Sequence, residues 1–119
     1  MKWADEEYCL YVNASEGSTL WQILADWTQS EDEELWKQHI PLFSRLIVQW
    51  HRWGFLKVRQ GAEWMAAALG DEVPADRLEA VLGDPANWEY DENPKVYTFV
   101  TVGDRDIVEL KDERGEIPE

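Results

Sequence analysis

The chain has 119 residues and a formal net charge of −14, from 25 acidic and 11 basic side chains. This length suits one domain with its own core, and 45% hydrophobic with 30% charged residues is typical of a folded protein rather than a disordered one. The charge disfavours non-specific binding to nucleic acid or to an anionic membrane, because both are negative. We therefore expect a basic protein as partner and no membrane partner.

We predict a single globular domain over residues 1–111 and an acidic, flexible tail over residues 112–119, which have little apolar surface to bury. No apolar run approaches the roughly 18 residues that cross a bilayer. Acids occupy the start, where a signal peptide would be apolar. Cys9 is the single cysteine and cannot form an internal disulfide. These features predict a cytoplasmic location.

The first third of the chain predicts helices. Residues 4–14 suit a helix or a strand, and the acids near their start favour the helix. Residues 19–29 repeat apolar side chains at helical spacing, directly after Ser18, a residue type that caps helix starts. Ser30 and Glu33 have the spacing of a capping box, which predicts the start of a third helix.

A further helix is predicted over residues 41–53. Pro41 suits the first helical position, and Gly54 suits the position just after the end. The apolar stripe of this helix consists of Leu42, Phe43, Leu46, Ile47, Trp50 and Trp53. Residues 55–59 then alternate between apolar and polar side chains, which predicts a short strand.

Basic side chains are segregated in this part of the sequence. Residues 35–62 contain five basic residues and no acidic one. Arg45, Gln49 and Arg52 recur at helical spacing on a face apart from the apolar stripe. Two explanations stand at this point: the basic stretch folds against its acidic flanks, or it presents a basic surface.

The second half predicts shorter elements. Residues 62–69 and 74–82 read as two short helices, and residues 87–95 form an acidic loop. Residues 95–102 are rich in β-branched and aromatic side chains, which predicts a strand, and residues 106–110 suit either its hairpin partner or a helix. The predicted fold class is α+β, mainly helical, with a small antiparallel β-sheet.

The order of these elements resembles a winged helix-turn-helix domain over residues 18–60 and 95–102. The residues that carry the resemblance are Arg52, Trp53, Gly54, Phe55, Leu56, Lys57 and Val58, where a recognition helix would run into the first wing strand. The resemblance implies a winged-helix-like helix bundle that reads DNA. In that family the wing strands follow each other closely, whereas about 35 residues separate Arg59 from Lys95 here.

Acidity and small size give a second resemblance, to bacterial immunity proteins and antitoxins. That resemblance implies a protein that inhibits a basic toxin by presenting acids to it. It rests on overall character and on no particular motif.

Catalytic and metal-binding patterns are not found in the sequence. His39 and His51 lie on different predicted helices, without the spacing of a zinc site. Cys9 has no neighbouring base or cation that would make it a nucleophile. There is no phosphate-binding loop and no dinucleotide fingerprint. We expect a protein that is not an enzyme and that has no metal and no cofactor.

Tryptophan is unusually frequent, with eight residues. Those on helix stripes, which we expect to fill the core, are Trp21, Trp27, Trp36, Trp50 and Trp53. Trp88 and Tyr90 instead lie in the acidic loop. Either they are exposed anchors for a partner, or Trp88 docks its own loop on the domain.

The favoured function is a small acidic, non-catalytic protein-binding module, of the immunity or antitoxin type. Its predicted partner-binding residues are Trp88, Glu89, Tyr90, Asp91 and Glu92. The alternative is a winged-helix transcriptional regulator, whose predicted DNA-binding residues are Arg45, Gln49, Arg52, Lys57 and Arg59. A third interpretation is a subunit that completes its apolar surface by forming a homodimer.

Overall fold

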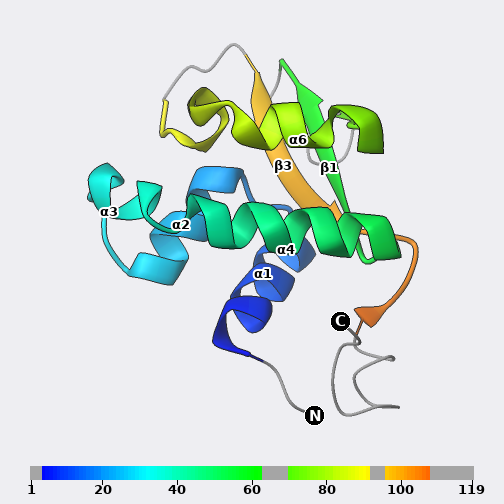
Figure 1. Cartoon of the computed structure of the whole chain (residues 1–119), viewed down its shortest axis with the longest axis horizontal. Helices are drawn as coiled ribbons and strands as arrows, with labels where there is room; N and C mark the ends of the chain where they lie inside the picture. Colours follow the sequence, from blue (N-terminus) through cyan, green and yellow to red (C-terminus); the bar gives the residue numbers. More distant parts are fainter. Residues whose placement is uncertain (1–3, 63–69, 92–95, 108–119) are drawn as a thin grey trace.

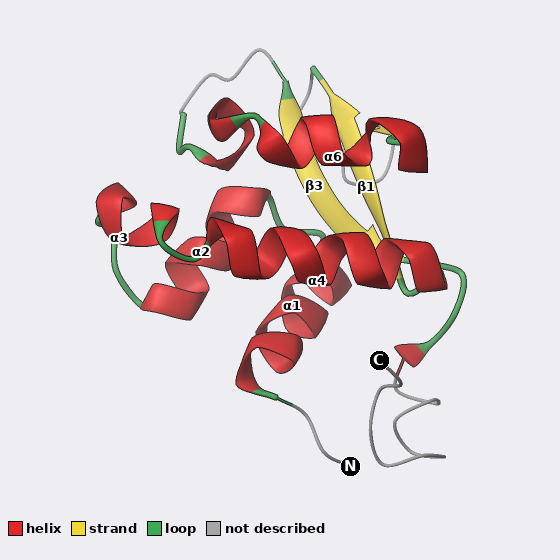
Figure 2. Cartoon of the chain, in the orientation of Figure 1, coloured by secondary structure: helices red, strands yellow, loops and turns green. Residues whose placement is uncertain are grey.

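A computed structural model describes residues 4–62, 70–91 and 96–107 (Figure 1). The first helices are α1 (Asp5–Glu16), α2 (Leu20–Thr28), α3 (Glu33–Lys37) and α4 (Ile40–Trp53). They are followed by β1 (Leu56–Gly61), β2 (Asp71–Glu72), α6 (Ala75–Gly83), the 3-10 helix η1 (Pro85–Trp88) and β3 (Tyr97–Val102). Helices dominate the described chain, and β1 and β3 run side by side behind α6 (Figure 2). The structure confirms the predicted α+β class.

The sheet has the strand order β2-β1-β3, and both pairings are antiparallel. β3 also contacts the connection between α1 and α2 along its other edge: Thr19 and Phe99 form a β-bridge, and the Val100 N–H donates to the Ser18 carbonyl at 2.9 Å. This contact joins the N-terminal helices to the sheet, because β3 lies between the α1–α2 connection and β1.

Helix starts follow local capping chemistry, with two shifts from prediction. Residues 5–16 form a helix, as predicted from their acids. α2 begins one residue later than expected, because Thr19 rather than Ser18 is the N-cap. The capping box predicted from Ser30 is not formed. Asp32 is the N-cap of α3, and its carboxylate accepts the Glu34 N–H at 3.0 Å.

The core is built around α4. It begins with Pro41 in its first turn and ends at Gly54, whose left-handed φ of 84° stops the helix. Its buried side chains are Phe43, Leu46, Ile47 and Trp50. Of the other predicted core tryptophans, Trp36 is buried, while Trp21, Trp27 and Trp53 are partly buried and pack against the core. The prediction that these tryptophans supply core area is confirmed.

Later elements are confirmed where the structure describes them. α6 matches the helix predicted over residues 74–82, and β3 matches the predicted second strand. The helix predicted over residues 62–69 and the tail over residues 112–119 fall almost wholly or wholly outside the described residues. Beyond β3, Asp106 is not in a strand, and Ile107 is helical and buried.

The end of β3 is clamped onto the turn between α4 and β1. The Gly103 N–H donates to the Phe55 carbonyl at 2.9 Å, and the Arg105 N–H donates to the Gly54 carbonyl at 3.0 Å. The Arg105 guanidinium also lies 4.9 Å from the centre of the Phe55 ring. A Cβ atom on Gly103 would lie only 2.8 Å from the Leu56 nitrogen. Only glycine therefore fits there without moving backbone.

Two glycine substitutions should have opposite effects on stability. Gly103→Ala should lower the free energy of unfolding by about 1–3 kcal/mol, because its methyl group overlaps backbone atoms. Gly83→Ala is the matched control: no atom lies within 4 Å of the added Cβ, and alanine favours the helix by up to about 1 kcal/mol. Urea unfolding measures both. A Gly103→Ala protein as stable as the parent would contradict the described packing.

Candidate functional site

An acidic surface forms where the start of α3 meets the segment after η1. The Tyr90 N–H donates to Glu33 Oε1 at 3.3 Å, which joins two segments far apart in the sequence. The Tyr90 ring meets Trp21 edge-on, with 5.0 Å between ring centres, and Trp21 stacks on Trp36 at 6.1 Å. We define the acidic aromatic surface as Trp21, Glu31, Asp32, Glu33, Glu34, Glu89, Tyr90 and Asp91.

Carboxylates of both segments lie near Lys37. The ammonium of Lys37 has its pKa raised mainly by its hydrogen bond to Glu34, at 3.1 Å, and then by the charge of Glu34. Glu89 and Glu33 add smaller effects in the same direction, although they come from different segments. One exposed lysine therefore faces acids from both segments. The acidic aromatic surface carries six exposed carboxylates around a half-exposed tyrosine.

The predicted partner-binding residues divide into a buried and an exposed group. Trp88 is only 2% exposed, and its Nε1–H donates to the Leu82 carbonyl at 2.8 Å. This corrects the expectation that Trp88 is an exposed anchor: it docks its own segment on the domain, because burial removes its large apolar area from water. Glu89, Tyr90 and Asp91 are exposed, with Tyr90 at 50%. Glu92 lies outside the described residues.

Sequence reasoning missed the other half of this surface. The sequence places Glu33 at a helix start, which is correct, since Asp32 is the N-cap and Glu33 and Glu34 lie in the first turn of α3; the sequence also places Trp21 in the core. Their proximity to Tyr90 depends on α2 packing against η1. No local pattern encodes that contact. The available signal was only that residues 31–34 and 89–92 are both acidic runs with aromatic neighbours.

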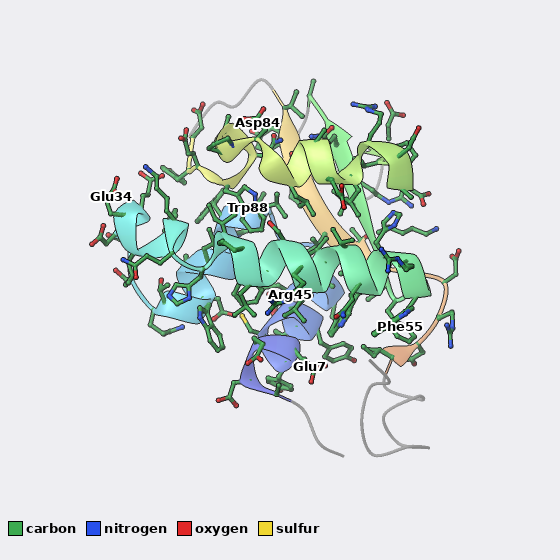
Figure 3. All side chains as sticks on the ribbon, in the orientation of Figure 1. Glu7, Glu34, Arg45, Phe55, Asp84 and Trp88 are labelled. Carbon is green, nitrogen blue, oxygen red and sulfur yellow. The ribbon has the colours of Figure 1, made fainter. Side chains whose placement is uncertain are left out.

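A second feature is a groove of about 580 Å³ between α4 and the α6–η1 segment. Figure 3 labels Arg45 on α4 and Trp88 on η1, next to α4. The apolar lining residues include Ile40, Val48, Leu82, Pro85 and Trp88, and the polar ones are Ser44, Arg45, Gln49, Arg52 and Glu79. We call this feature the α4–α6 groove. Trp88 belongs to its lining and also leads directly into the acidic aromatic surface.

The residues predicted to bind DNA are brought together only in part. Arg45, Gln49 and Arg52 line the α4–α6 groove. Lys57 is instead held in the sheet region by ion pairs with Asp104 at 3.2 Å and Glu72 at 3.8 Å. Arg59 lies beside it on β1, and its Nη1 donates to the Gly70 carbonyl at 3.2 Å. The basic stretch therefore folds partly against acids, as one of the two explanations expected.

α6 lies beside the helix that carries Arg45 and Arg52, and this limits the shape of a partner that can reach them. An α-helix with its side chains is about 10–12 Å across, close to the 12 Å width of the DNA major groove. α6 packs along α4 and shares the groove lined by both arginines. A duplex that approached these arginines would meet two helices side by side. α4 thus does not project alone on the side where it contacts α6.

The cysteine and the two histidines of the described residues contact neighbouring groups within the fold. The Cys9 thiol is buried, and burial first and Asp26 second raise its pKa to about 12. His39 Nδ1 accepts the Trp27 Nε1–H at 3.3 Å, and His51 Nε2 lies 3.3 Å from the Val73 carbonyl. Across residues 4–62, 70–91 and 96–107, no three His, Cys, Asp or Glu residues are grouped closely enough to hold a metal ion.

Comparisons of the chain with protein-family models, with curated proteins and with solved structures find no match in any of the three. Within the described part of the chain, no helix combines the length and the apolar character needed to cross a membrane. The geometry of the acidic aromatic surface and of the α4–α6 groove therefore carries the functional conclusion.

Replacement of Trp88 tests its structural position. Trp88→Ala should lower the free energy of unfolding by about 3–5 kcal/mol, because it empties a large buried site. Trp88→Phe should cost less, since it keeps much of the ring and loses the hydrogen bond to Leu82. Urea unfolding gives both values, with the half-exposed Tyr90→Ala as control. Unchanged stability in Trp88→Ala would mean that this side chain is exposed in solution.

The environment of Cys9 predicts slow chemistry in the folded protein. Its folded pKa, about 12, exceeds its ordinary value of 9.0, so between these values the folded state keeps a proton that the unfolded chain loses. The free energy of unfolding should therefore fall as pH rises through this window. At a pH of about 8.5, iodoacetamide should alkylate the native protein far more slowly than the urea-unfolded chain. Equal rates would show that the thiol is accessible and ionised.

Proposed function

We propose that this protein is a small, non-catalytic binding module that captures a basic protein through its acidic aromatic surface. The observation that carries the proposal is the anchoring of Tyr90: its amide is held by Glu33 while its ring, packed on Trp21, stays half exposed. Such a module would act by occlusion. It would inhibit its partner in the way that immunity proteins and antitoxins do. The protein resembles those proteins in its small size and its acidity.

The chemistry of the surface suits that role. Aromatic side chains supply large contact areas with few rotatable bonds, and they are enriched among residues that dominate binding energy. Because Tyr90 is already held in place in the free protein, little conformational freedom would be lost on binding. The surrounding carboxylates attract a basic partner and orient its approach. Tyr90 would therefore supply affinity, and the acids would supply steering and selection.

A non-catalytic role agrees with the state of the reactive side chains. Burial keeps the Cys9 thiol protonated, and both histidines are engaged in contacts with neighbouring groups. The acidic aromatic surface contains carboxylates and aromatic rings that lie on the outside of the domain. Binding by occlusion needs no further group, and we include no cofactor in the proposal.

DNA binding by a winged helix is the second candidate. Its support is the chain order, in which α4 leads into β1, β1 pairs with β3, and β3 bridges back to Thr19. Against it stand the packing of α6 beside Arg45 and Arg52, the ion pairs of Lys57, and the net charge of −14. We rank it below protein binding for these reasons.

Two charge-matched variants test the proposal. The surface variant carries Glu33→Gln, Tyr90→Ala and Asp91→Asn. The control carries Asp5→Asn, Glu6→Gln and Tyr8→Ala on α1, where Tyr8 is 56% exposed. With a labelled Arg- and Lys-rich peptide, anisotropy should show about tenfold weaker binding for the surface variant and less than twofold for the control. Each variant removes two negative charges and one tyrosine, so a difference in affinity between them reports where the substitutions lie and not how much charge they remove.

Equal losses in both variants would mean that only overall charge attracts the peptide, and the surface assignment would be wrong. Mixed duplex DNA is the second probe, at about 50 and 200 mM salt. We expect no binding. Binding that weakens steeply between these salt concentrations and is lost in Arg45→Ala would instead favour the winged-helix candidate.

A further inference from the structure

We propose that the α4–α6 groove binds an acidic amphipathic helix of a partner protein, with two carboxylates against Arg45 and Arg52 and apolar side chains on the groove floor. This site is separate from the acidic aromatic surface and selects the opposite charge. It uses different residues, so either site can fail without the other.

The first support is exposed positive charge without a protein partner at Arg45 and Arg52. Basic side chains with a hydrogen bond or ion pair among the described residues are Lys37, Lys57, Arg59 and Arg105. Arg45, Arg52 and Arg77 have neither with any described residue, although the chain contains 25 acids, and of these three only Arg45 and Arg52 line the groove. Both line the groove, where Glu79 is the one acid of the lining. Guanidinium groups bind carboxylates through paired, charge-assisted hydrogen bonds.

The second support is spacing. Arg45 and Arg52 are seven residues apart on α4, which is two helical turns, or about 10.5 Å along the axis. Gln49 lies between them and lines the same groove. A helix that lies along α4 has the same repeat, so acids at positions i and i+7 of that helix would meet the two arginines together. Carboxylates three residues apart would reach only one.

The third support is the apolar floor between these arginines. Ile40 and Val48 are partly buried and keep apolar surface open to the groove, and the almost fully buried Leu82 and Trp88 hold that floor in place from beneath. An apolar side chain at i+3 or i+4 of a bound helix would lie over this floor while its acids reach the arginines. Glu79, on the α6 wall, offers one acceptor that would disfavour a third acid there. The α4 wall of the groove is therefore basic and the α6 wall carries an acid, so a bound helix would turn its acids toward α4.

Shape decides between a protein segment and other anions. The groove holds about 580 Å³ and lies between two helices rather than inside the domain. Enclosed ligand sites bury most of a small molecule, which this surface groove would leave exposed. A duplex is too wide to lie between the helices. The net charge of −14 acts weakly here, because at physiological salt the Debye length is about 8 Å, so the arginines dominate inside the groove.

The experiment uses a labelled alanine-based helical peptide with Leu anchors and two Glu residues seven positions apart. Matched peptides carry the Glu pair three positions apart, or Gln in place of both. Arg45→Ala or Arg52→Ala should weaken binding of the seven-spaced peptide about ten- to hundredfold, and both matched peptides should bind correspondingly worse. Arg77→Ala is the control: it removes the same charge from α6 but does not line the groove. It should change affinity less than twofold.

Several results would overturn this inference. The inference is wrong if the seven-spaced peptide does not bind below about 1 mM, or if the peptides with the two Glu spacings bind equally well. It is also wrong if Arg77→Ala weakens peptide binding as much as Arg45→Ala does. A single-stranded oligonucleotide that bound more tightly than the peptide would assign the groove to nucleic acid. A dimer of the protein alone that dissociates in Arg45→Ala, seen by sedimentation velocity, would assign it to a second copy of the chain. The basic-peptide assay with the Glu33 and Tyr90 variant is unaffected by any of these outcomes.

Discussion

The hydrogen bond from the Trp88 indole to the Leu82 carbonyl is the contact on which both surfaces depend. It holds η1 against the end of α6, and Asn87 strengthens this corner by donating to the Val81 carbonyl at 2.8 Å and accepting from Thr98 at 3.3 Å. With η1 fixed, the buried indole forms part of the groove lining, and the chain emerges directly toward Tyr90. One buried residue therefore positions the floor of a basic groove and the anchor of an acidic surface.

The sequence predicted those features that local chemistry encodes. Pro41, Gly54 and the apolar stripe specified α4 almost to the residue, and β-branched residues specified β3. Tyr90 was predicted as a contact residue, and it is exposed. The sequence could not decide the position of Trp88, because a large aromatic side chain in an acidic loop is equally compatible with an exposed anchor for a partner and with a buried contact to its own domain. The contact between Tyr90 and Glu33 was out of reach, since only long-range packing creates it.

Charge patterning had the same limit. The acid-free stretch of the sequence left two explanations open, packing against acidic flanks or a basic surface, and the structure divides the stretch between a strand and a helix. On β1, Lys57 forms ion pairs with Asp104 and Glu72, so its charge is balanced within the domain. On α4, Arg45 and Arg52 face a groove with one acid. The side-chain direction of each element, together with what packs beside it, determines which charges a partner can meet.

The segment between β1 and β3 changes what α4 can recognise. Without α6, the polar face of α4 would project as a single helix, a shape that fits a DNA major groove. With α6 beside it, the same arginines border a groove with an apolar floor, a shape that fits one further helix. The acidic body would then repel polyanions at long range, whereas in our proposal the arginines accept isolated carboxylates within a Debye length. Long-range charge and short-range geometry would thus select different partners, and this is why the proposed acidic helix and the exclusion of nucleic acid are compatible in one protein.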